Sequence, residues 1–398
     1  MITVQQAEKI ILDQTRDYGV EDVPFELALG RVLAADIRAD RDLPPYNRAT
    51  MDGIAISFNH FEKGTRTFRV KAVQAAGDHP VPVFETGDCI EIMTGAALHE
   101  SVDTVVRYED LEIKDGFASL LTDSITRAQS IHQMGKDRKQ QEVVAGAFQY
   151  VTPAIISIAA SVGASILPVM RLPRTVIISS GDELVDVNDK PLPFQVRRSN
   201  NYTVQAVLKL HGLPSSMIHI PDDAAIIHQE LQNCLEKHDV ILLSGGISMG
   251  KFDFIPRVLE KLSVHTLFHK VSQRPGKPFW FGKKENGPLV FAFPGNPVAT
   301  FMCLHRYFLP WLESSLNVRG KKELYAALSE DFNFSPPLQY FLQVKLTANR
   351  HAQLLAEPTE GNGSGDFANL VDTDAFLELP LDKINFRKGE VFRVWPFK

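Results

Sequence analysis

The sequence predicts a multidomain α/β protein, with a three-layer α/β domain built on a parallel-type sheet, a discontinuous helical domain, an inserted β module and a small C-terminal β domain. Its length of 398 residues is well beyond the usual size of one hydrophobic core, so several domains are expected. Short alternating apolar stretches fill residues 54–140, whereas strand-like and helix-like stretches alternate from about residue 170 to residue 315. Hydrophobic residues at 44% and charged residues at 23% are typical of an ordinary globular protein.

The N-terminal segment predicts a helix whose domain is interrupted by the β module. Residues 3–18 place Val4, Ala7, Ile10 and Ile11 on one helical face, and Gly19 follows as a helix stop. The segment "DLPPYNRATMDGIAI" then changes the structure, because two prolines forbid a helix there. A second helical segment follows near residues 152–163. We therefore expect a helical domain at 1–40 and 141–168 and the inserted β module at 41–140.

The next stretch alternates between strands and helices. Predicted strands are "RTVIIS", "SSMIHI", "DVILLSGG", "VHTLFHKV" and "PLVFAFPG", and predicted helices include "NNYTVQAVLKLHG" and "DDAAIIHQELQNCLEKH". This alternation predicts a parallel sheet covered by helices on both faces, at residues 169–317. From about residue 320 short strands return, in "YFLQVKL", "AFLELP" and "EVFRVWPF", which predicts the C-terminal β domain at 318–398.

The charge balance and the cysteines limit the function classes. A formal net charge of -6 provides no basic surplus for non-specific binding of nucleic acid, so we expect no nucleic-acid partner. The three cysteines lie far apart with no metal-type spacing, which fits a reducing compartment. The N-terminus lacks the apolar core of a signal peptide, and no run approaches the roughly 20 apolar residues of a membrane helix. We expect a cytoplasmic protein without a membrane contact.

Three predicted strands of the α/β domain end in turn-forming polar sequence, in "TVIISSGDEL", "DVILLSGGISMGKFD" and "LVFAFPGNP". Ligands of open α/β sheets gather outside the carboxyl ends of the strands. Gly245 and Gly246 would let backbone amides approach a phosphate, and Ser244 and Ser248 would supply hydroxyl donors. A single "SGG" favours a tight turn with a helix cap, but three such loops in one sheet favour a binding site.

Carboxylates accompany these loops. Asp182 and Glu183 follow a strand, where they could hold Mg²⁺ or form an N-cap with an acidic first turn. Outside the sheet, Asp52, Thr94 and Asp137 lie in turn-forming sequence. The chemistry of these three residues alone predicts only turns.

Cationic side chains lie beside a proline-containing turn. Arg274 and Lys277 flank the Pro-Gly pair of "SQRPGKPFWFG", with Lys270 upstream. Proline restricts the loop before a ligand arrives, so a cation on it is partly preorganised against an anion, although an exposed turn has the same sequence signature. The rigid turn "PGNP" precedes a helix, and a capping role for Asn296 competes there with a role in binding.

Taken together and in this order, the motifs resemble those of the MoeA family, the molybdopterin molybdenumtransferases, which includes the C-terminal enzyme domain of gephyrin. The match is carried by "LPPYNRATMDGIAI", "IMTGAALHESVDTVVRYED", "SSGDEL", "SGGISMGKFDF", "RPGKPFWFG", "FPGNPVA" and "GSGDFANL". The resemblance implies that the α/β domain is MogA-like, that the helical domain is elongated and that the C-terminal β domain is barrel-like.

The resemblance also implies an activity in molybdenum cofactor biosynthesis. A member of this family inserts molybdate into the dithiolene of adenylylated molybdopterin and releases AMP, assisted by Mg²⁺ or a similar divalent ion. It forms an elongated homodimer in which the α/β domain of one subunit and the β module of the other line the cleft. Contact with the molybdopterin adenylyltransferase, which makes the substrate, is a further expected partnership.

By position, the resemblance assigns roles to particular residues of this chain. The residues implied in catalysis are Asp52, Thr94, Asp137, Glu183, Asp222 and Asp253. Those implied in binding the substrates are Gly245, Gly246, Ser248, Lys270, Arg274, Lys277, Pro294, Gly295, Asn296 and Ser364. The candidates to hold the metal are Asp52, Glu183 and Asp253.

Several positions depart from the family pattern, among them the following three, and two other functions compete. Arg274 replaces a common lysine, Lys251 an acidic residue and Arg198 a frequent aspartate. The enzymatic rival is molybdopterin adenylylation by the MogA family, whose members are single short domains with a GG-T-G loop where this chain has "SGGIS". The second rival is a non-catalytic scaffold or binding module like gephyrin, against which the retained carboxylates and Lys277 count.

Overall fold

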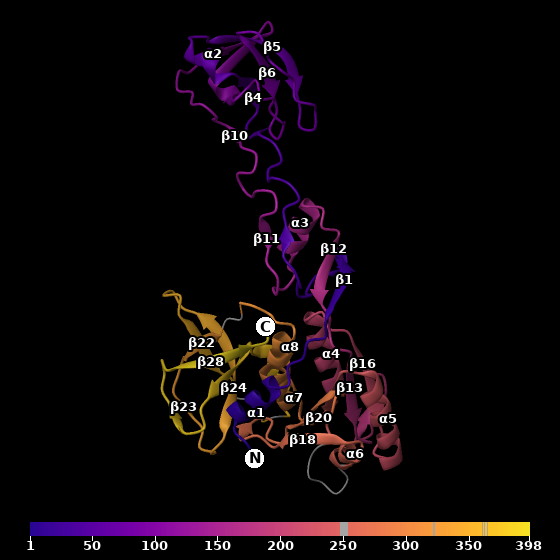
Figure 1. Cartoon of the computed structure of the whole chain (residues 1–398). Helices are drawn as coiled ribbons and strands as arrows, with labels where there is room; N and C mark the ends of the chain where they lie inside the picture. Colours follow the sequence, from indigo (N-terminus) through magenta and orange to yellow (C-terminus); the bar gives the residue numbers. More distant parts are fainter. Residues whose placement is uncertain (247–253, 321–322, 360, 362, 364) are drawn as a thin grey trace. The chain divides into compact units, whose positions relative to one another are not determined.

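The computed structural model describes residues 1–246, 254–320, 323–359, 361, 363 and 365–398 (Figure 1). The chain divides into two compact units. The first unit comprises Met1–Ala34, Phe148–Thr152 and Ile166–Lys398, and the second comprises Ala35–Ala147 and Pro153–Ser165. In the described part of the chain, no helix has the length and apolar character needed to cross a membrane.

A six-stranded sheet forms the centre of the first unit. Its strand order is β16 (Ser215–Ile220), β13 (Thr175–Ser180), β17 (Val240–Ser244), β21 (Leu289–Phe293), β20 (Trp280–Lys284) and β18 (Val264–His269). The first four strands are parallel, whereas β20 runs antiparallel to both of its neighbours. The predicted α/β fold is therefore confirmed, with one correction: the sheet is mixed, because the segment between β18 and β20 is too short for a crossover.

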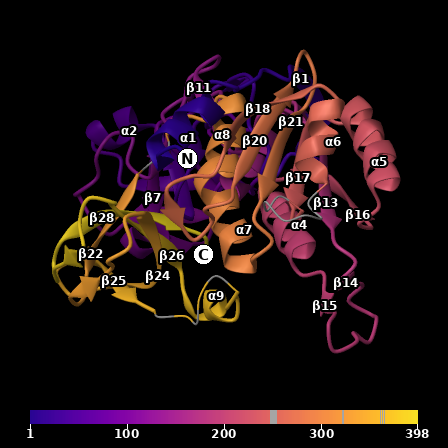
Figure 2. The ribbon, with the colours of Figure 1, turned by 90° about the horizontal axis from the view of Figure 1, so that it is seen from below.

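Two helical layers cover this sheet because successive strand residues point to opposite faces. Ile177 of β13 belongs to an apolar cluster with α1 (Val4–Leu12), α4 (Asn200–Leu210), α7 (Pro297–Cys303) and α8 (Leu309–Ser315). Val176 and Ile178 pack on the other face, with α5 (Ala224–Lys237) and α6 (Ile255–Lys261). Figure 2 shows α5 and α6 apart from α7 and α8, which gives the predicted three layers. The short π-helix η3 (Leu304–Phe308) joins α7 to α8.

Helix α1 departs from the predicted domain grouping. Its N-cap Thr3 forms a capping box with Gln6, and the buried residues Val4, Ala7 and Ile11 lie on the predicted face. These residues join the core of the first unit, whereas α3 (Pro153–Ser161) belongs to the second unit. The two helices thus do not share one hydrophobic core, because α1 buries its apolar face against α8. The four domain boundaries otherwise stay a prediction.

The C-terminal strands close into a small barrel within the first unit. The order is β24 (Gln339–Ala348), β25 (Leu354–Pro358), β22 (Leu324–Leu328), β28 (Val391–Pro396) and β26 (Ala375–Leu379), and β26 pairs again with β24. Closure removes the free strand edges, as expected for the barrel-like domain. The two-residue strand β19 (Gln273–Arg274) pairs with the start of β24 and so attaches the segment after β18 to the barrel.

The second unit contains another six-stranded sheet, confirming the predicted β module. Its order is β7 (Thr104–Arg107), β4 (Gly53–Ile56), β6 (Asp88–Ile92), β5 (Thr67–Gln74), β9 (Phe117–Leu120) and β8 (Leu111–Lys114). Gly53 is required by close packing, since a Cβ atom there would lie 1.9 Å from the carbonyl oxygen of Val106. Apolar clusters around Ile54 and Ala55 cover the two faces.

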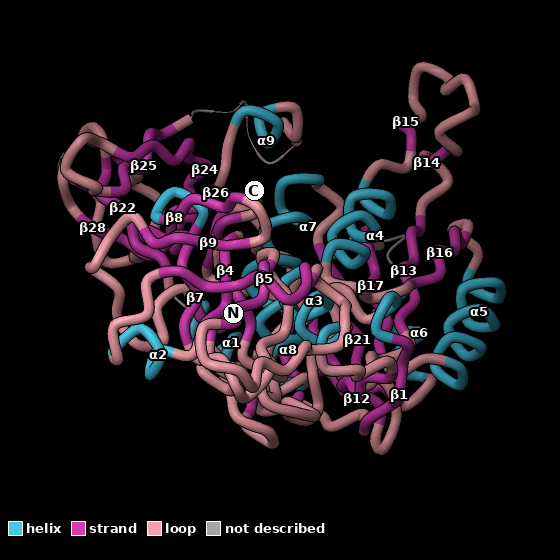
Figure 3. Tube along the Cα trace, turned by 90° about the horizontal axis from the view of Figure 1, so that it is seen from above, coloured by secondary structure: helices cyan, strands magenta, loops and turns pink. Residues whose placement is uncertain are grey.

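Short elements complete the two units. In the first unit these are β1 (Val20–Pro24), η1 (Phe25–Leu27), β12 (Ile166–Met170), β14 (Leu184–Val185), β15 (Val196–Arg197), β23 (Phe332–Asn333), α9 (Asn369–Asp372) and β27 (Asn385–Phe386). In the second unit they are β2 (Ile37–Arg38), β3 (Arg48–Ala49), α2 (Phe58–Glu62), η2 (Tyr108–Asp110), β10 (Ile131–His132) and β11 (Val143–Ala145). Figure 3 shows the arm between β14 and β15 projecting beyond the sheet.

Candidate active site

The parallel strands bring the predicted strand-end residues to one edge of the first unit's sheet. β16, β13, β17 and β21 are neighbours, so their carboxyl ends meet there. The loops that follow carry Asp222, Glu183, Gly245 and Pro294. The amide of Gly245 donates to the carbonyl of Phe293 at 3.3 Å, which joins the ends of β17 and β21.

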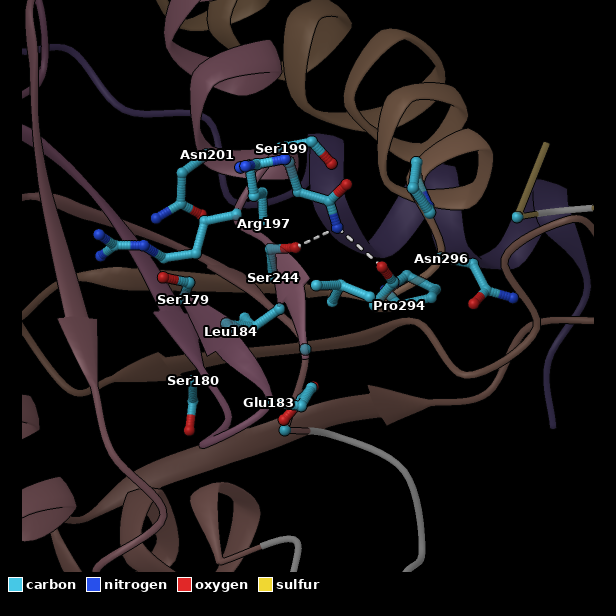
Figure 4. A pocket seen from close by; sticks show the side chains of 18 of the residues that line it. Ser179, Ser180, Glu183, Leu184, Arg197, Ser199, Asn201, Ser244, Pro294 and Asn296 are labelled. Atoms are coloured by element: carbon cyan, nitrogen blue, oxygen red, sulfur yellow. Dashed lines mark hydrogen bonds between the residues drawn. The ribbon is translucent and has the colours of Figure 1, made fainter. Parts of the chain in front are cut away.

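A pocket of about 700 Å³, the larger pocket, opens at this edge (Figure 4). Its lining combines hydroxyl, amide and glycine backbone groups: Ser179, Ser180, Ser199, Asn200, Asn201, Ser244, Gly245, Gly246, Gly295 and Asn296. Glu183 also lines it, and Phe367 lines it from the C-terminal region. The pocket therefore offers many neutral hydrogen-bonding groups at the place where α/β sheets bind ligands.

Asn200, at the start of α4, was missed by the sequence analysis. Its Nδ2 atom donates to the Oγ of Ser244 at 2.8 Å and to the carbonyl of Gly295 at 2.7 Å (Figure 4). One side chain thus ties the ends of two strands together at the pocket wall. The only sequence signal is a polar "SNN" before a helical pattern, which is typical of a helix start.

Asp222 is engaged in the link between β13 and β16. Its carboxylate accepts from the Oγ of Ser180 at 3.1 Å and from the amide of Asp182 at 3.4 Å, and its own amide donates to Asp182 at 3.1 Å. Glu183, in contrast, lines the larger pocket and makes no side-chain hydrogen bond or ion pair within the described residues. Of these two candidates, Glu183 is the one whose carboxylate is free of partners among the described residues.

A second pocket of about 490 Å³, the smaller pocket, adjoins the first. Arg274 and Lys277 line it, and both side chains are exposed. In the described part of the chain neither cation pairs with a carboxylate, although the guanidinium of Arg274 lies 5.8 Å from the ring centroid of Phe334. The smaller pocket is therefore basic. Lys270 lines neither pocket, and its backbone bonds to Phe279 and Ile2.

The loop after β21 separates the two pockets. Pro278, Pro294, Gly295 and Asn296 line both of them, and we call these four residues the shared wall. Thr300 holds this wall, since its Oγ1 donates to the carbonyl of Pro294 at 2.6 Å. Asn296 occupies the N-cap position of α7 without a side-chain capping bond, and Figure 4 shows its side chain on the far side of Pro294 from Ser244.

Arg198, one of the departures from the family pattern, forms an ion pair with Asp186. The pKa of Asp186 is lowered, first by a backbone hydrogen bond from Asn188 and then by the charge of Arg198. Arg198 lines the larger pocket. Its positive charge is partly balanced by Asp186, which belongs to the arm between β14 and β15.

In the second unit, the two predicted turns meet. Both the amide and the Oγ1 of Thr94 donate to Asp52 Oδ1, at 2.6 and 2.7 Å. These bonds lower the pKa of Asp52, the side-chain bond from Thr94 contributing most. Both residues are exposed. The turns of Asp52 and Thr94, for which the sequence alone predicted no function, thus place an ionised carboxylate at the surface.

Asp137 lies in another hydrogen-bonded group of the second unit. Its Oδ1 atom lies 2.9 Å from Nε2 of His132, whose Nδ1 lies 3.4 Å from the guanidinium of Arg48. β3 and β10 pair His132 directly with Arg48. The arrangement orients the imidazole and leaves the carboxylate half exposed, at 54% of its side chain.

Several predicted residues lie outside the described residues: Ser248, Asp253, Ser364 and the departure Lys251. Within the described ranges, no group of three or more histidine, cysteine, aspartate or glutamate side chains is placed to hold a metal ion. The described residues therefore do not assemble the predicted metal site of Asp52, Glu183 and Asp253.

Comparisons with known proteins cover the whole chain. Family models match residues 2–163 (MoeA N-terminal region, domain I and II), 176–314 (probable molybdopterin binding domain) and 325–397 (MoeA C-terminal region, domain IV). A molybdopterin molybdenumtransferase of Synechocystis sp. is 36% identical over 395 residues, which cover 98% of this chain and 99% of that protein. A relative of the same name from Staphylococcus epidermidis is 27% identical over 400 residues, covering 99% and 95%. The crystal structure of a molybdopterin biosynthesis MoeA protein from Pyrococcus horikoshii OT3 shares the fold over 100% of both chains, with a TM-score of 0.83 and 24% identity.

Proposed function

Because the chain belongs to the molybdopterin molybdenumtransferase family, we propose that its two adjoining pockets hold the two substrates of one transfer reaction. The protein is a transferase of molybdenum cofactor biosynthesis. It inserts molybdate into adenylylated molybdopterin and releases AMP. The observation that carries the assignment of substrates is the shared wall, which lines a large pocket with many neutral hydrogen-bonding groups on one side and a small pocket with Arg274 and Lys277 on the other.

The larger pocket suits the organic substrate. Its volume of about 700 Å³ is within the range of pockets that bind nucleotide-sized ligands. The glycine backbone at 245–246 permits close approach of a phosphate, and the N-terminus of α4 at Asn200 adds the positive end of a helix dipole. Neutral serine and asparagine groups supply donors and acceptors for a heterocycle.

The smaller pocket suits molybdate, which is a dianion. Arg274 and Lys277 provide two positive charges without a carboxylate competitor in the described part of the chain. Charge-assisted hydrogen bonds from these groups would neutralise and orient the oxygens of the anion. The shared wall would then place the anion beside the dithiolene of the organic substrate, which is the geometry that a transfer between them needs.

The reaction also requires protons and stabilisation of the leaving group. Oxygen of molybdate leaves as water, which consumes protons, and Asp52, Glu183 and Asp253 are the proposed carriers. Preorganised donors and cations stabilise the charge that develops on AMP as it departs. Glu183 is suited to the transfer of protons because its carboxylate lines the larger pocket.

Mg²⁺ is proposed as an assisting ion, held by Asp52, Glu183 and Asp253 beside the phosphates. Of these three, Glu183 lies in the larger pocket, Asp52 belongs to the second unit and Asp253 lies outside the described residues. The described residues do not by themselves assemble a cation site. When bound, the ion would neutralise phosphate charge.

We further propose a homodimer in which the second unit of one subunit completes the site on the first unit of the other. This proposal is supported by Asp52 and Thr94, which are exposed and hydrogen-bonded to each other as a surface pair. A contact with the molybdopterin adenylyltransferase, for direct transfer of the adenylylated substrate, belongs to the same proposal. The three cysteines are free and buried, which is consistent with the cytoplasm as the location.

The test is a defined reconstitution. Purified protein with adenylylated molybdopterin, molybdate and Mg²⁺ should release AMP and form active cofactor, and omission of molybdate should slow AMP release. AMP that forms only from ATP and molybdopterin would instead identify an adenylyltransferase. Absence of both reactions, with no binding of molybdate or nucleotide, would identify a scaffold or binding module.

A further inference from the structure

The cationic segment between β18 and β20 is fastened at its base by backbone hydrogen bonds. The amide of Lys270 donates to the carbonyl of Phe279 at 3.0 Å, and the amide of Val271 donates to the carbonyl of Lys277 at 2.9 Å. Arg274 lies within the loop that these bonds close. The base is thus fixed, but these bonds do not set the position of the loop's tip.

A buried glutamine fills the interior of this loop. Gln273 is 0% exposed, and its Nε2 donates to the carbonyl of Gly276 at 3.1 Å and contacts the Sγ of Cys303 at 3.5 Å. Its Oε1 accepts a hydrogen bond from the hydroxyl of Tyr307. Both polar atoms of the amide are therefore engaged, one with the loop and one with the helical layer.

The fit between this amide and the loop is tight. Gly276 has a φ of +90°, and a Cβ atom there would lie 2.8 Å from Nε2 of Gln273 and 2.9 Å from Sγ of Cys303. A side chain at this position would push the loop away from the amide. The tip of the loop therefore lies directly against Gln273.

Tyr307 fixes the orientation of the amide. Its ring is 1% exposed and packs against Phe279 at a centroid distance of 5.0 Å, with the guanidinium of Arg306 at 5.2 Å from its centroid. Arg306 is itself held by two hydrogen bonds of 2.8 Å to Glu8. Burial raises the pKa of Tyr307 well above its ordinary value, so the hydroxyl keeps its proton and stays a donor. A donating hydroxyl selects Oε1, which leaves Nε2 for Gly276.

We propose that Gln273 is a positioning residue for the oxyanion, which sets the places of Arg274 and Lys277 by holding the carbonyl of Gly276 from inside the loop. The inference rests on the assignment of molybdate to the smaller pocket. It goes beyond it by naming a side chain that determines affinity for the anion without carrying charge. Arg274 directly follows Gln273, and Lys277 directly follows Gly276, so a shift of either anchor moves a cation.

The first test is Gln273→Met, which keeps the length and volume of the side chain and removes its hydrogen bonds. Loss of one such bond changes an equilibrium constant on the order of fivefold. We therefore expect the KM for molybdate to rise about tenfold, while the KM for adenylylated molybdopterin stays within about twofold. Calorimetric titration of the purified full chain with molybdate should show a similar loss of affinity.

The matched control is Gln339→Met. Gln339 is 3% exposed and pairs with Gln273 between β19 and β24. Its side-chain amide bonds to Gln5 and Glu378, and only its backbone amide bonds to the loop, at the carbonyl of Ser272, which the substitution leaves in place. This control should leave the KM for molybdate within about twofold of the unmodified protein. An equal rise in both methionine variants, or no rise in Gln273→Met, would overturn the proposal.

Two further variants separate positioning from stability. Tyr307→Phe removes only the hydroxyl and should raise the KM for molybdate about threefold in a folded protein. In Gln273→Glu, the buried carboxyl can donate to Gly276 only when protonated, so the KM for molybdate should approach the unmodified value at low pH and rise with pH. A KM in Gln273→Glu that follows the same pH profile as the unmodified protein would count against the proposal.

These outcomes are distinguishable from a failure of the proposed function. If the unmodified protein binds molybdate but forms no cofactor, the molybdenum-transfer assignment fails, while the calorimetric comparison of the variants still decides the role of Gln273. If the unmodified protein transfers molybdenum and Gln273→Met does so with unchanged KM, the positioning role alone is refuted.

Discussion

Asn200 joins the ends of β17 and β21, and replacement by alanine should loosen both at once. Its Nδ2 atom donates to Ser244 at 2.8 Å and to the carbonyl of Gly295 at 2.7 Å. A typical hydrogen bond contributes about 1 kcal/mol net. Because the bond to Gly295 is open to solvent, we expect Asn200→Ala to lower the free energy of unfolding of the first unit by about 1–2 kcal/mol.

The assay can read the first unit alone. All three tryptophans, Trp280, Trp311 and Trp395, belong to the first unit, so intrinsic fluorescence reports its unfolding without a signal from tryptophan in the second unit. With a urea m-value on the order of 3 kcal/mol/M, the expected loss shifts the midpoint by roughly 0.3–0.7 M. The KM for adenylylated molybdopterin should rise several-fold, because the wall of the larger pocket loses its support.

Two comparisons make this prediction refutable. Asn233→Ala, on helix α5, removes one surface hydrogen bond of 3.3 Å and should leave the midpoint unchanged or slightly raised, since alanine favours a helix. In Asn200→Asp, the hydroxyl of Ser244 can still donate to the new carboxylate. The carbonyl of Gly295 has no proton to donate, so its oxygen and the carboxylate oxygen of residue 200 repel each other. A midpoint for Asn200→Ala equal to that of the unmodified protein would show that this side chain does not couple the strand ends.

Three further predictions follow from the pockets and the second unit. Lys277→Ala should raise the KM for molybdate on the order of tenfold, measured by steady-state kinetics at saturating organic substrate, because a charge-assisted hydrogen bond is lost. Thr94→Val should raise the pKa of Asp52 towards its ordinary value, measured by NMR titration, since the largest cause of the lowered pKa disappears. A lowered folded-state pKa adds stability above the unfolded-state pKa that is lost as pH falls through the folded-state value, so this acid-dependent loss should shrink in Thr94→Val. Gly53→Ala should destabilise the second unit by more than about 2 kcal/mol, measured by amide hydrogen exchange, because its Cβ would lie 1.9 Å from the carbonyl oxygen of Val106.

Each of these has its own control. Lys261→Ala changes a lysine at the end of α6 that lines neither pocket, and an equal rise in KM there would remove the argument for Lys277. Thr94→Ser keeps the hydroxyl donor, so its Asp52 should titrate as in the unmodified protein. Gly64→Ala, at a φ of +101° with no atom within 4 Å of the added Cβ, separates backbone strain from the collision at Gly53.

The layers of the first unit were predictable because parallel strands buried on both faces have continuous apolar sequence. β13, β17 and β21 are buried along their whole length, and each was recognised as a strand. β20 was missed because its few apolar residues follow a Pro-Gly turn, and the polar arm between β14 and β15 carries no periodic pattern. Helix α1 was assigned correctly as a helix but to the wrong core, since periodicity identifies an apolar face and not its partner.

Some residues of the candidate site could likewise be predicted from the sequence, and others could not. Residues directly after a strand, such as Glu183 and Gly245, could be found from sequence because parallel strands share one edge. Asn200 and Gln273 could not, since the carbonyl of Gly295 lies 95 residues from Asn200 and the hydroxyl of Tyr307 lies 34 residues from Gln273. Such polar contacts form only in the folded chain, and no local sequence pattern predicts them.

The shared wall constrains how this enzyme can change during evolution. Pro294, Gly295 and Asn296 line both pockets, so under the proposed assignment of substrates a substitution among them alters the recognition of two substrates together. Arg274 and Lys277 line the smaller pocket and not the larger one. Selection for a different oxyanion therefore has an independent route through residues 274–277, whereas the wall is pleiotropic. If that segment binds the metal anion as proposed, a lineage can adjust its choice of anion there while its recognition of the organic substrate is inherited unchanged.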